Sequence, residues 1–136
     1  LGSGAGLPGL VLAIMRPAWS ITLVESRRLR VEWLRSSAAA LDCENVVVEG
    51  QNVTQIGPVE ADIITARAFA PLHRLLSLSA RFSTPLTEWV LPKGRSAAQE
   101  VAELPSDLRR MFHVEQSLSD PTAGVIVGSG QVRALR

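Results

Sequence analysis

A glycine-rich loop opens the chain and restricts the folds that it can adopt. Residues 1–9 read Leu-Gly-Ser-Gly-Ala-Gly-Leu-Pro-Gly and lead into an apolar run over residues 10–15. Loops of this type follow a strand and open a helix in nucleotide-binding α/β folds, because glycines let backbone N–H groups approach a ligand closely. Pro8 suits the first turn of such a helix, and Pro17 predicts that the helix ends at Arg16. We therefore expect an α/β fold whose first strand belongs before Leu1.

Short apolar segments that favour strands alternate with helical patterns along the rest of the chain. Strands are expected at residues 20–24, 46–48, 62–66, 89–91, 113–118 and 124–127, and helices at residues 27–41, 72–82 and 97–104. This alternation predicts a mostly parallel sheet with helices on both faces. A tight turn alone separates the last two strands, so these two should pair as an antiparallel hairpin. Residues 51–61 are expected to form a loop.

Three smaller features complete the expected fold. Ser106 can cap a short helical turn that runs through Phe112. Trp19, Trp33 and Trp89 are expected to anchor the core, as large apolar side chains do. The polar, glycine-containing tail over residues 128–136 is expected to be frayed.

The composition indicates one folded domain over residues 1–136 and argues against several classes of function. Of 136 residues, 46% are apolar and 20% charged, and the net charge is +1. A nearly neutral chain can hold a polyanion only through a local patch. One cysteine rules out a disulfide framework, and two widely spaced histidines, His73 and His113, leave no metal site. The opening apolar run is shorter than the ~18 residues of a membrane span, and no membrane contact is expected.

The glycine loop fits two kinds of cofactor. Gly4-x-Gly6-x-x-Gly9 matches the dinucleotide fingerprint, whereas Gly2-x-Gly4-x-Gly6 matches the looser loop of nucleoside-binding methyltransferases. Glu25 lies about 20 residues downstream, at the end of the next strand, where a carboxylate can accept hydrogen bonds from two ribose hydroxyls.

Pro8 separates these two cofactors. It removes an N–H group that a pyrophosphate would use at the helix start. S-adenosylmethionine carries no phosphate, so the proline favours it. A dinucleotide-dependent oxidoreductase stays open as an alternative.

Four segments resemble one family of rRNA methyltransferases. They are the opening loop, Leu-Val-Glu-Ser at 23–26, Ala-Arg-Ala-Phe-Ala-Pro-Leu at 66–72 and Pro-Lys-Gly-Arg at 92–95. Together they are similar to the RsmG (GidB) family of small-subunit ribosomal RNA guanine-N7 methyltransferases. The ending at 113–121, His-Val-Glu-Gln-Ser-Leu-Ser-Asp-Pro, resembles its alphaproteobacterial members. The resemblance implies a class I methyltransferase fold, Rossmann-like, that lacks its first strand and the N-terminal helices of the family in this chain.

The resemblance also implies roles for particular residues. The residues matched to S-adenosylmethionine binding are Gly2, Gly4, Gly6 and Leu7 in the first loop, Glu25 at the ribose, Val53 and Thr54 at the adenine, and Arg67 near the cofactor and the reacting base. Arg67 and Lys93 are the candidate catalytic residues. Family members commonly carry Arg-Val-Glu where this chain has Asn52-Val53-Thr54. The two neutral replacements keep open a non-catalytic RNA-binding or ribosome assembly factor on the same fold.

Methylation of guanine N7 needs positioning and no general base, because N7 carries a lone pair and no proton. Correct positioning can supply roughly 7–11 kcal/mol of a barrier. We expect Arg67 to orient the cofactor or contact guanine O6, and Lys93 to hold an RNA phosphate. The implied substrate is 16S ribosomal RNA, within a small-subunit particle or assembly intermediate in the cytoplasm.

Overall fold

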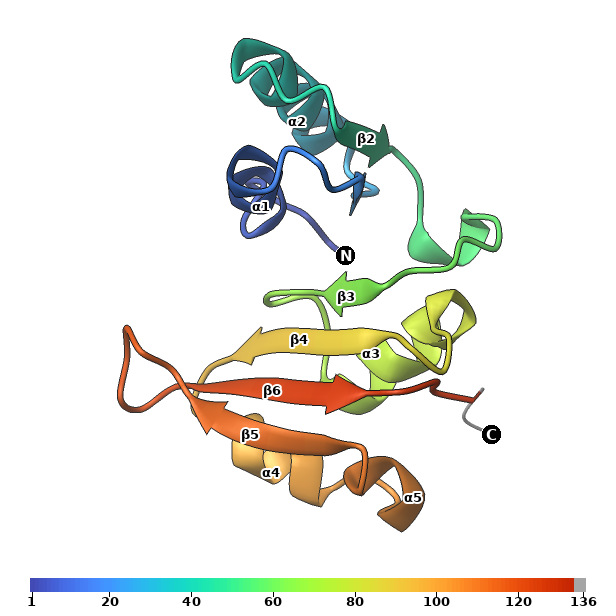
Figure 1. The fold of residues 1–136 in the computed structure, drawn as a ribbon, viewed down its shortest axis with the longest axis vertical. Helices are drawn as coiled ribbons and strands as arrows, with labels where there is room; N and C mark the ends of the chain where they lie inside the picture. The colour runs from blue at the N-terminus through green and yellow to red at the C-terminus, as the bar shows by residue number, and fades with distance from the viewer. Residues whose placement is uncertain (134–136) are drawn as a thin grey trace. The chain divides into compact units, whose positions relative to one another are not determined.

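The computed structural model describes residues 1–133, which form two compact units, Leu1–Gly57 and Pro58–Arg136, the second described as far as residue 133. The first unit contains α1 (Gly9–Met15), β1 (Ile21–Val24), α2 (Arg28–Ala40), β2 (Val46–Glu49) and the short 3-10 helix η1 (Val53–Gln55). The second contains β3 (Ile63–Thr65), α3 (Leu72–Ser79), the 3-10 helix η2 (Ala80–Phe82), β4 (Glu88–Lys93), α4 (Ala97–Ala102), α5 (Ser106–Arg109), β5 (Phe112–Gln116) and β6 (Gly124–Ser129). Figure 1 shows this order along the chain.

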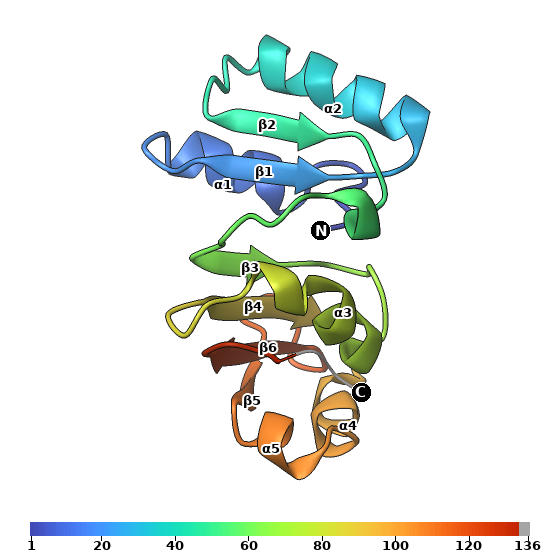
Figure 2. The ribbon, with the colours of Figure 1, turned by 90° about the vertical axis from the view of Figure 1, so that its right-hand side faces the viewer.

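In the first unit, β1 and β2 form a parallel pair in which Ile21 lies opposite Val46 and Val24 opposite Glu49. Helix α1 packs on β1, and α2 packs on β2 (Figure 2). Helical spacing predicts one apolar face of Val31, Leu34, Ala38 and Leu41, and α2 buries the first three. Leu34 and Ala38 join a core with residues of α1 and β1, so the predicted helix is confirmed, whereas Leu41, its C-cap residue, is 50% exposed.

The side chain of one asparagine stabilises the connection between α1 and β1. The Asn45 side-chain amide donates hydrogen bonds to the carbonyls of Ala13 (3.2 Å), Arg16 (3.2 Å) and Trp19 (3.0 Å). These carbonyls lie at the end of α1 and in the turn that follows it, where helix geometry leaves acceptors without partners. The predicted end of the first helix is confirmed, because Arg16 is its C-cap residue.

In the second unit, four strands form one mixed sheet in the order β3-β4-β6-β5. Strands β3 and β4 are parallel, whereas β6 runs antiparallel to both of its neighbours. The antiparallel pairing of β5 with β6 confirms the predicted hairpin. Helices α3 and α4 lie on one face of this sheet (Figures 1 and 2), where α4 contacts β5 and β6.

The turn of this hairpin is held by a side chain. The Asp120 carboxylate accepts hydrogen bonds from the Thr122 amide (2.9 Å) and the Thr122 hydroxyl (2.7 Å). These bonds favour the charged carboxylate, so they lower the pKa of Asp120.

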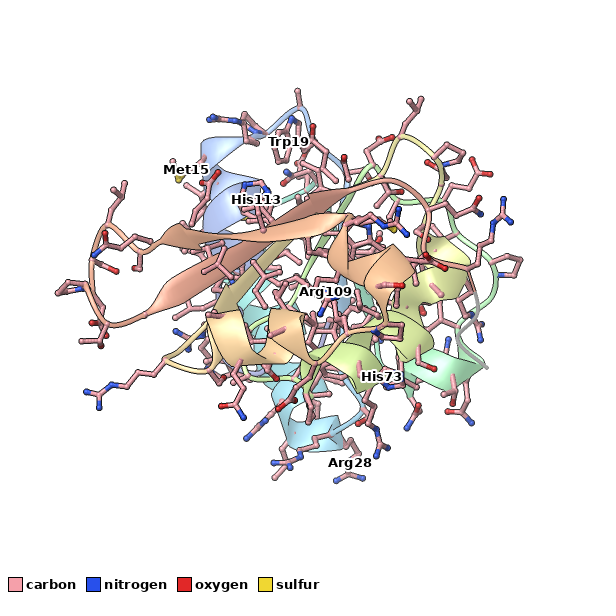
Figure 3. The ribbon with its side chains drawn as sticks, turned by 90° about the horizontal axis from the view of Figure 1, so that it is seen from below. Met15, Trp19, Arg28, His73, Arg109 and His113 are labelled. Carbon is pink, nitrogen blue, oxygen red and sulfur yellow. The ribbon has the colours of Figure 1, made fainter. Side chains whose placement is uncertain are left out.

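The tryptophan prediction is right for one residue and wrong for two. Trp89 is fully buried, its indole N–H donates to the Gly130 carbonyl at 2.9 Å, and its ring meets Phe112 edge-on. Trp19 and Trp33 are 40% and 50% exposed. The Arg16 guanidinium lies over the Trp19 ring, which Figure 3 labels, and Trp33 lies on a different face of α2 from the buried residues. Sequence spacing alone does not determine whether an isolated aromatic side chain faces the core or the solvent.

Several predicted boundaries are also corrected. Part of the tail predicted to be frayed is ordered by long-range contacts: β6 extends to Ser129, and Val132 is buried, with its amide donating to the Ser83 hydroxyl at 3.1 Å. Residues 134–136 lie outside the described part of the chain. Strand β4 is longer than predicted and runs through Lys93. Ser106 does not cap α5, because Pro105 occupies the N-cap position.

Candidate functional site

The glycine loop of the first unit takes a backbone path that favours glycine. Gly2, Gly4 and Gly6 all have positive φ angles, of 59°, 49° and 85°. The Ser3 amide donates to the Val24 carbonyl at 2.9 Å, which ties the loop to the end of β1. The Leu10 amide donates to the Gly6 carbonyl at 2.7 Å and starts the turn into α1. Since residues with side chains rarely adopt such φ angles, three glycines here specify the loop.

Glu25 faces this loop from the end of β1. It is only 5% exposed, and its carboxylate accepts hydrogen bonds from the amides of Gly4 (3.1 Å) and Arg27 (3.3 Å). A carboxylate offers about four acceptor positions, so two backbone donors leave capacity for hydroxyl groups. Glu25 is therefore a buried, oriented acceptor next to the loop and not a solvated residue at a strand end.

Val53 and Thr54 lie in η1, within a segment that the sequence predicts to be a loop. The Asn52 side-chain oxygen accepts from the Thr54 amide (3.0 Å) and the Thr54 hydroxyl (2.9 Å). In return, the Gln55 side chain accepts from the Asn52 amide at 3.3 Å, which completes a capping box. Asn52 and Thr54 thus fix the backbone at Val53.

The first unit brings together most of the predicted cofactor residues. Because β1 and β2 are parallel, the segments that follow them leave the sheet at the same edge. Glu25 and the glycine loop lie at the end of β1, and η1 follows β2. Leu7, also predicted to contact the cofactor, is 47% exposed at the start of α1.

A pocket of about 360 Å³ lies beside the glycine loop within this unit. It is lined by Gly4, Ala5, Leu29, Arg30 and Trp33. Only Gly4 is a predicted site residue. Leu29 and Trp33 lie four residues apart and off the buried face of α2, and this spacing is the sequence signal that indicates the helical side of the pocket.

In the second unit, Arg67 and Lys93 follow or end two neighbouring parallel strands. Arg67 is exposed in the loop after β3, where Ala68 has a positive φ of 50°, and Phe69 is half-buried. Lys93 ends β4, and its side chain is only 10% exposed. The Lys93 ammonium donates to the Ala70 carbonyl at 2.7 Å and lies 3.3 Å from Glu100.

Glu100 is the polar residue of this region that sequence reasoning missed. Its carboxylate also accepts from the Leu72 amide at 3.1 Å, across 28 positions of the chain. An acidic residue in the first turn of a helix, as Glu100 is in α4, is common for local reasons. No local pattern therefore distinguishes it.

The described residues contain no group of three or more histidine, cysteine or acidic side chains placed to hold a metal ion. His73 lies on α3 and His113 on β5, well apart in Figure 3, and His113 pairs with Glu115. Among residues 1–133, no helix combines the length and the apolar character needed to cross a membrane.

Comparison with known proteins identifies close relatives. Residues 1–121 match the family model GidB, described as rRNA small subunit methyltransferase G. The chain is 54% identical to ribosomal RNA small subunit methyltransferase G of Erythrobacter litoralis, over 98% of this chain and 64% of that protein. It is 55% identical to the protein of the same name from Novosphingobium aromaticivorans, over 94% of this chain and 56% of that protein. The chain thus spans about 60% of the length of these relatives.

Solved structures share its fold at low sequence identity. The S-adenosylmethionine-dependent methyltransferase SibL matches with a TM-score of 0.72 and 15% identity, over 96% of this chain and 49% of that chain. A precorrin-6y methyltransferase from Geobacter metallireducens matches with a TM-score of 0.67 and 11% identity, over 97% and 78% of the two chains. These matches confirm the predicted class I methyltransferase fold.

Proposed function

The chain belongs to the GidB family of rRNA small subunit methyltransferase G proteins, and from this premise we propose that it forms the S-adenosylmethionine-dependent methyltransferase domain of an enzyme that methylates guanine N7 in 16S ribosomal RNA. The observation that carries the proposal is the buried Glu25 carboxylate, which faces the amide of Gly4 in the glycine loop. The domain includes residues 1–136.

The residues of the first unit fit S-adenosylmethionine. Glu25 provides acceptors for the ribose hydroxyls, and Gly2, Gly4, Gly6 and Leu7 provide backbone and apolar contacts from the loop. Val53 and Thr54 line the adenine side through the backbone that the η1 capping box fixes. Nothing in this set requires a phosphate, and Pro8 supplies no N–H group at the helix start. These features favour S-adenosylmethionine over a dinucleotide.

S-adenosylmethionine held by Glu25 and the glycine loop would supply an electrophilic methyl group, whose transfer to the N7 lone pair would leave a neutral thioether and a positively charged guanine. No proton leaves N7, so the protein needs no base. Arg67, exposed in the loop after β3, orients the cofactor or contacts O6, while N7 stays open. Lys93, which the sequence predicts to hold an RNA phosphate, ends β4 with its side chain only 10% exposed and its ammonium bonded to Ala70 and Glu100.

The substrate we propose is 16S ribosomal RNA within a small-subunit particle or assembly intermediate in the cytoplasm. The net charge of +1 supports a structured particle, because a nearly neutral chain gains little from the counterion release that drives binding to free RNA. The names of the relatives, which include the small ribosomal subunit, support the same class of substrate.

Calorimetric titration of the whole natural protein with S-adenosylmethionine and with NAD tests the cofactor. We expect micromolar binding of S-adenosylmethionine and none of NAD. Methyl transfer to small subunits lacking the modification, followed by borohydride reduction and aniline cleavage at 7-methylguanosine, tests the reaction. A folded protein that binds subunits but no S-adenosylmethionine would instead be an assembly factor, and NAD binding alone would indicate an oxidoreductase.

A further inference from the structure

A largely buried ion pair joins β4 to α4 in the second unit. The Lys93 ammonium lies 3.3 Å from the Glu100 carboxylate, and the two side chains are only 10% and 16% exposed. The Ser96 hydroxyl also donates to Glu100 at 3.4 Å. Buried charges are stable only when paired and hydrogen-bonded, so each residue depends on the other.

Both members of this pair also hold the segment that follows β3. The Lys93 ammonium donates to the Ala70 carbonyl at 2.7 Å, and Glu100 accepts from the Leu72 amide at 3.1 Å. These two backbone groups flank Pro71, the N-cap residue of α3. The pair therefore fixes the C-terminal end of the loop at residues 66–71.

The same loop contains Arg67, which we propose to contact the cofactor or the reacting base, and Ala68, whose backbone is strained. Arg67 is exposed, whereas Ala66 before it is buried at the end of β3. Ala68, directly after Arg67, has a positive φ of 50°, a conformation that residues with a Cβ avoid. Such a conformation persists only where surrounding contacts determine it. Burial of Ala66 supplies one anchor, and the Lys93–Glu100 pair supplies the other.

We propose that Glu100 is a positioning residue of the methyl transfer: through Lys93 and the Leu72 amide, it holds the 66–71 loop so that Arg67 stands where the reaction needs it. This inference rests on the proposed function. The proposal also gives Lys93 a structural role, because its ammonium contacts the Ala70 carbonyl and the Glu100 carboxylate.

Glu100→Gln removes the charge and keeps the size of the side chain. Glu103→Gln, at the end of the same helix, is the matched control, because Glu103 is exposed and, within residues 1–133, its carboxylate bonds to the Gln99 side chain one turn away. In the whole protein, we expect Glu100→Gln to raise the hydrogen-exchange rate of the Leu72 amide roughly fivefold, because the neutral glutamine oxygen accepts from that amide more weakly than the carboxylate does. Tryptic cleavage after Arg67 should rise with it, and Glu103→Gln should change neither.

The kinetic readout separates positioning from general destabilisation. With small subunits as substrate, we expect Glu100→Gln to lower kcat by about 100-fold, the cost of a small misplacement at a reacting centre. KM for the subunits and Kd for S-adenosylmethionine should stay within about threefold of the wild type, a difference of less than 1 kcal/mol. Unchanged exchange, cleavage and kcat, or equal losses in Glu103→Gln, would overturn the inference.

A double variant keeps the test decisive if Glu100→Gln does not fold. Lys93→Met with Glu100→Gln removes both buried charges, which such sites tolerate better than one charge left alone. Because both residues hold the same end of the loop, the folded double variant should show the faster Leu72 exchange and the lower kcat expected of Glu100→Gln; a folded double variant with wild-type exchange and wild-type kcat would overturn the inference. If the wild type transfers no methyl group, the proposed function fails and the kinetic role with it. Leu72 exchange and tryptic cleavage then decide whether Glu100 orders the loop.

Discussion

The Glu25 carboxylate accepts a hydrogen bond from the Gly4 amide at 3.1 Å and so joins the end of β1 to the glycine loop across 21 positions of the chain. A second bond, from the Arg27 amide at 3.3 Å, fixes the other carboxylate oxygen. The carboxylate is thus oriented before any ligand binds, which lowers the cost of ordering it on binding.

Glu25→Gln should weaken S-adenosylmethionine binding by about 10- to 100-fold, because a hydrogen bond to a charged acceptor contributes about 1.5–3 kcal/mol. Calorimetry on the folded variant measures this loss. Glu49→Gln is the matched control, since Glu49 ends the neighbouring strand β2 and its carboxylate accepts from Gln51. Equal losses in both variants would contradict a specific role for Glu25.

The glycines of the loop should differ sharply in their tolerance of alanine. A Cβ at Gly6 would overlap the Leu10 side chain, and the φ angle there is 85°. We expect Gly6→Ala to lower the free energy of unfolding by about 2–4 kcal/mol, which combines a left-handed conformation and overpacking. At Gly4 a Cβ would lie 3.8 Å from the nearest backbone oxygen, so Gly4→Ala should cost only about 1–2 kcal/mol. Urea denaturation of both variants measures the difference, and similar losses would contradict it.

Local patterns predict the parts of this molecule whose causes are local. The glycine loop, the end of α1 before Pro17, the buried face of α2 and the β5–β6 hairpin follow from short-range sterics and periodicity, and the structure confirms them. The strand-end position of Glu25 was predicted for the same reason. Its hydrogen bond to Gly4 adds an orientation that the sequence alone does not specify.

The features that the sequence missed depend on contacts between distant residues. Val132 is buried because its amide reaches Ser83, 49 positions away, although its segment reads as a polar tail. Lys93 looks like an exposed cation that follows a strand, yet β4 continues through it and α4 supplies its partner. The Asn45 side chain donates hydrogen bonds to three carbonyls at the end of α1 and in the turn after it, and no sequence motif predicts these bonds. Tertiary packing decides these cases.

The capping box of η1 should matter for the adenine side of the site. Asn52→Ala removes the acceptor for the Thr54 amide and hydroxyl, and a lost cap costs about 1 kcal/mol. We expect S-adenosylmethionine affinity to fall roughly fivefold, because the backbone at Val53 is then less ordered. Asn52→Asp should bind like the wild type, since aspartate caps equally well. If Asn52→Ala also bound like the wild type, η1 would have no part in the cofactor site.

Arg67→Ala tests the residue that the 66–71 loop presents to solvent. Its guanidinium forms no hydrogen bond or ion pair within residues 1–133, so its removal should leave the unfolding midpoint nearly unchanged, as for most surface substitutions. Methyl transfer to small subunits should fall by about 100-fold, because the base and the methyl group are no longer held in line.

Arg74→Ala is the control for this variant, because Arg74 is exposed on α3 of the same unit and its substitution removes the same charge. It should transfer methyl groups at the wild-type rate. A loss common to both variants would indicate a general electrostatic attraction to RNA, which added salt would weaken in both. If Arg67→Ala kept both cofactor affinity and turnover, Arg67 would have no role at the reacting centre, and the loop that Glu100 holds would serve a different purpose.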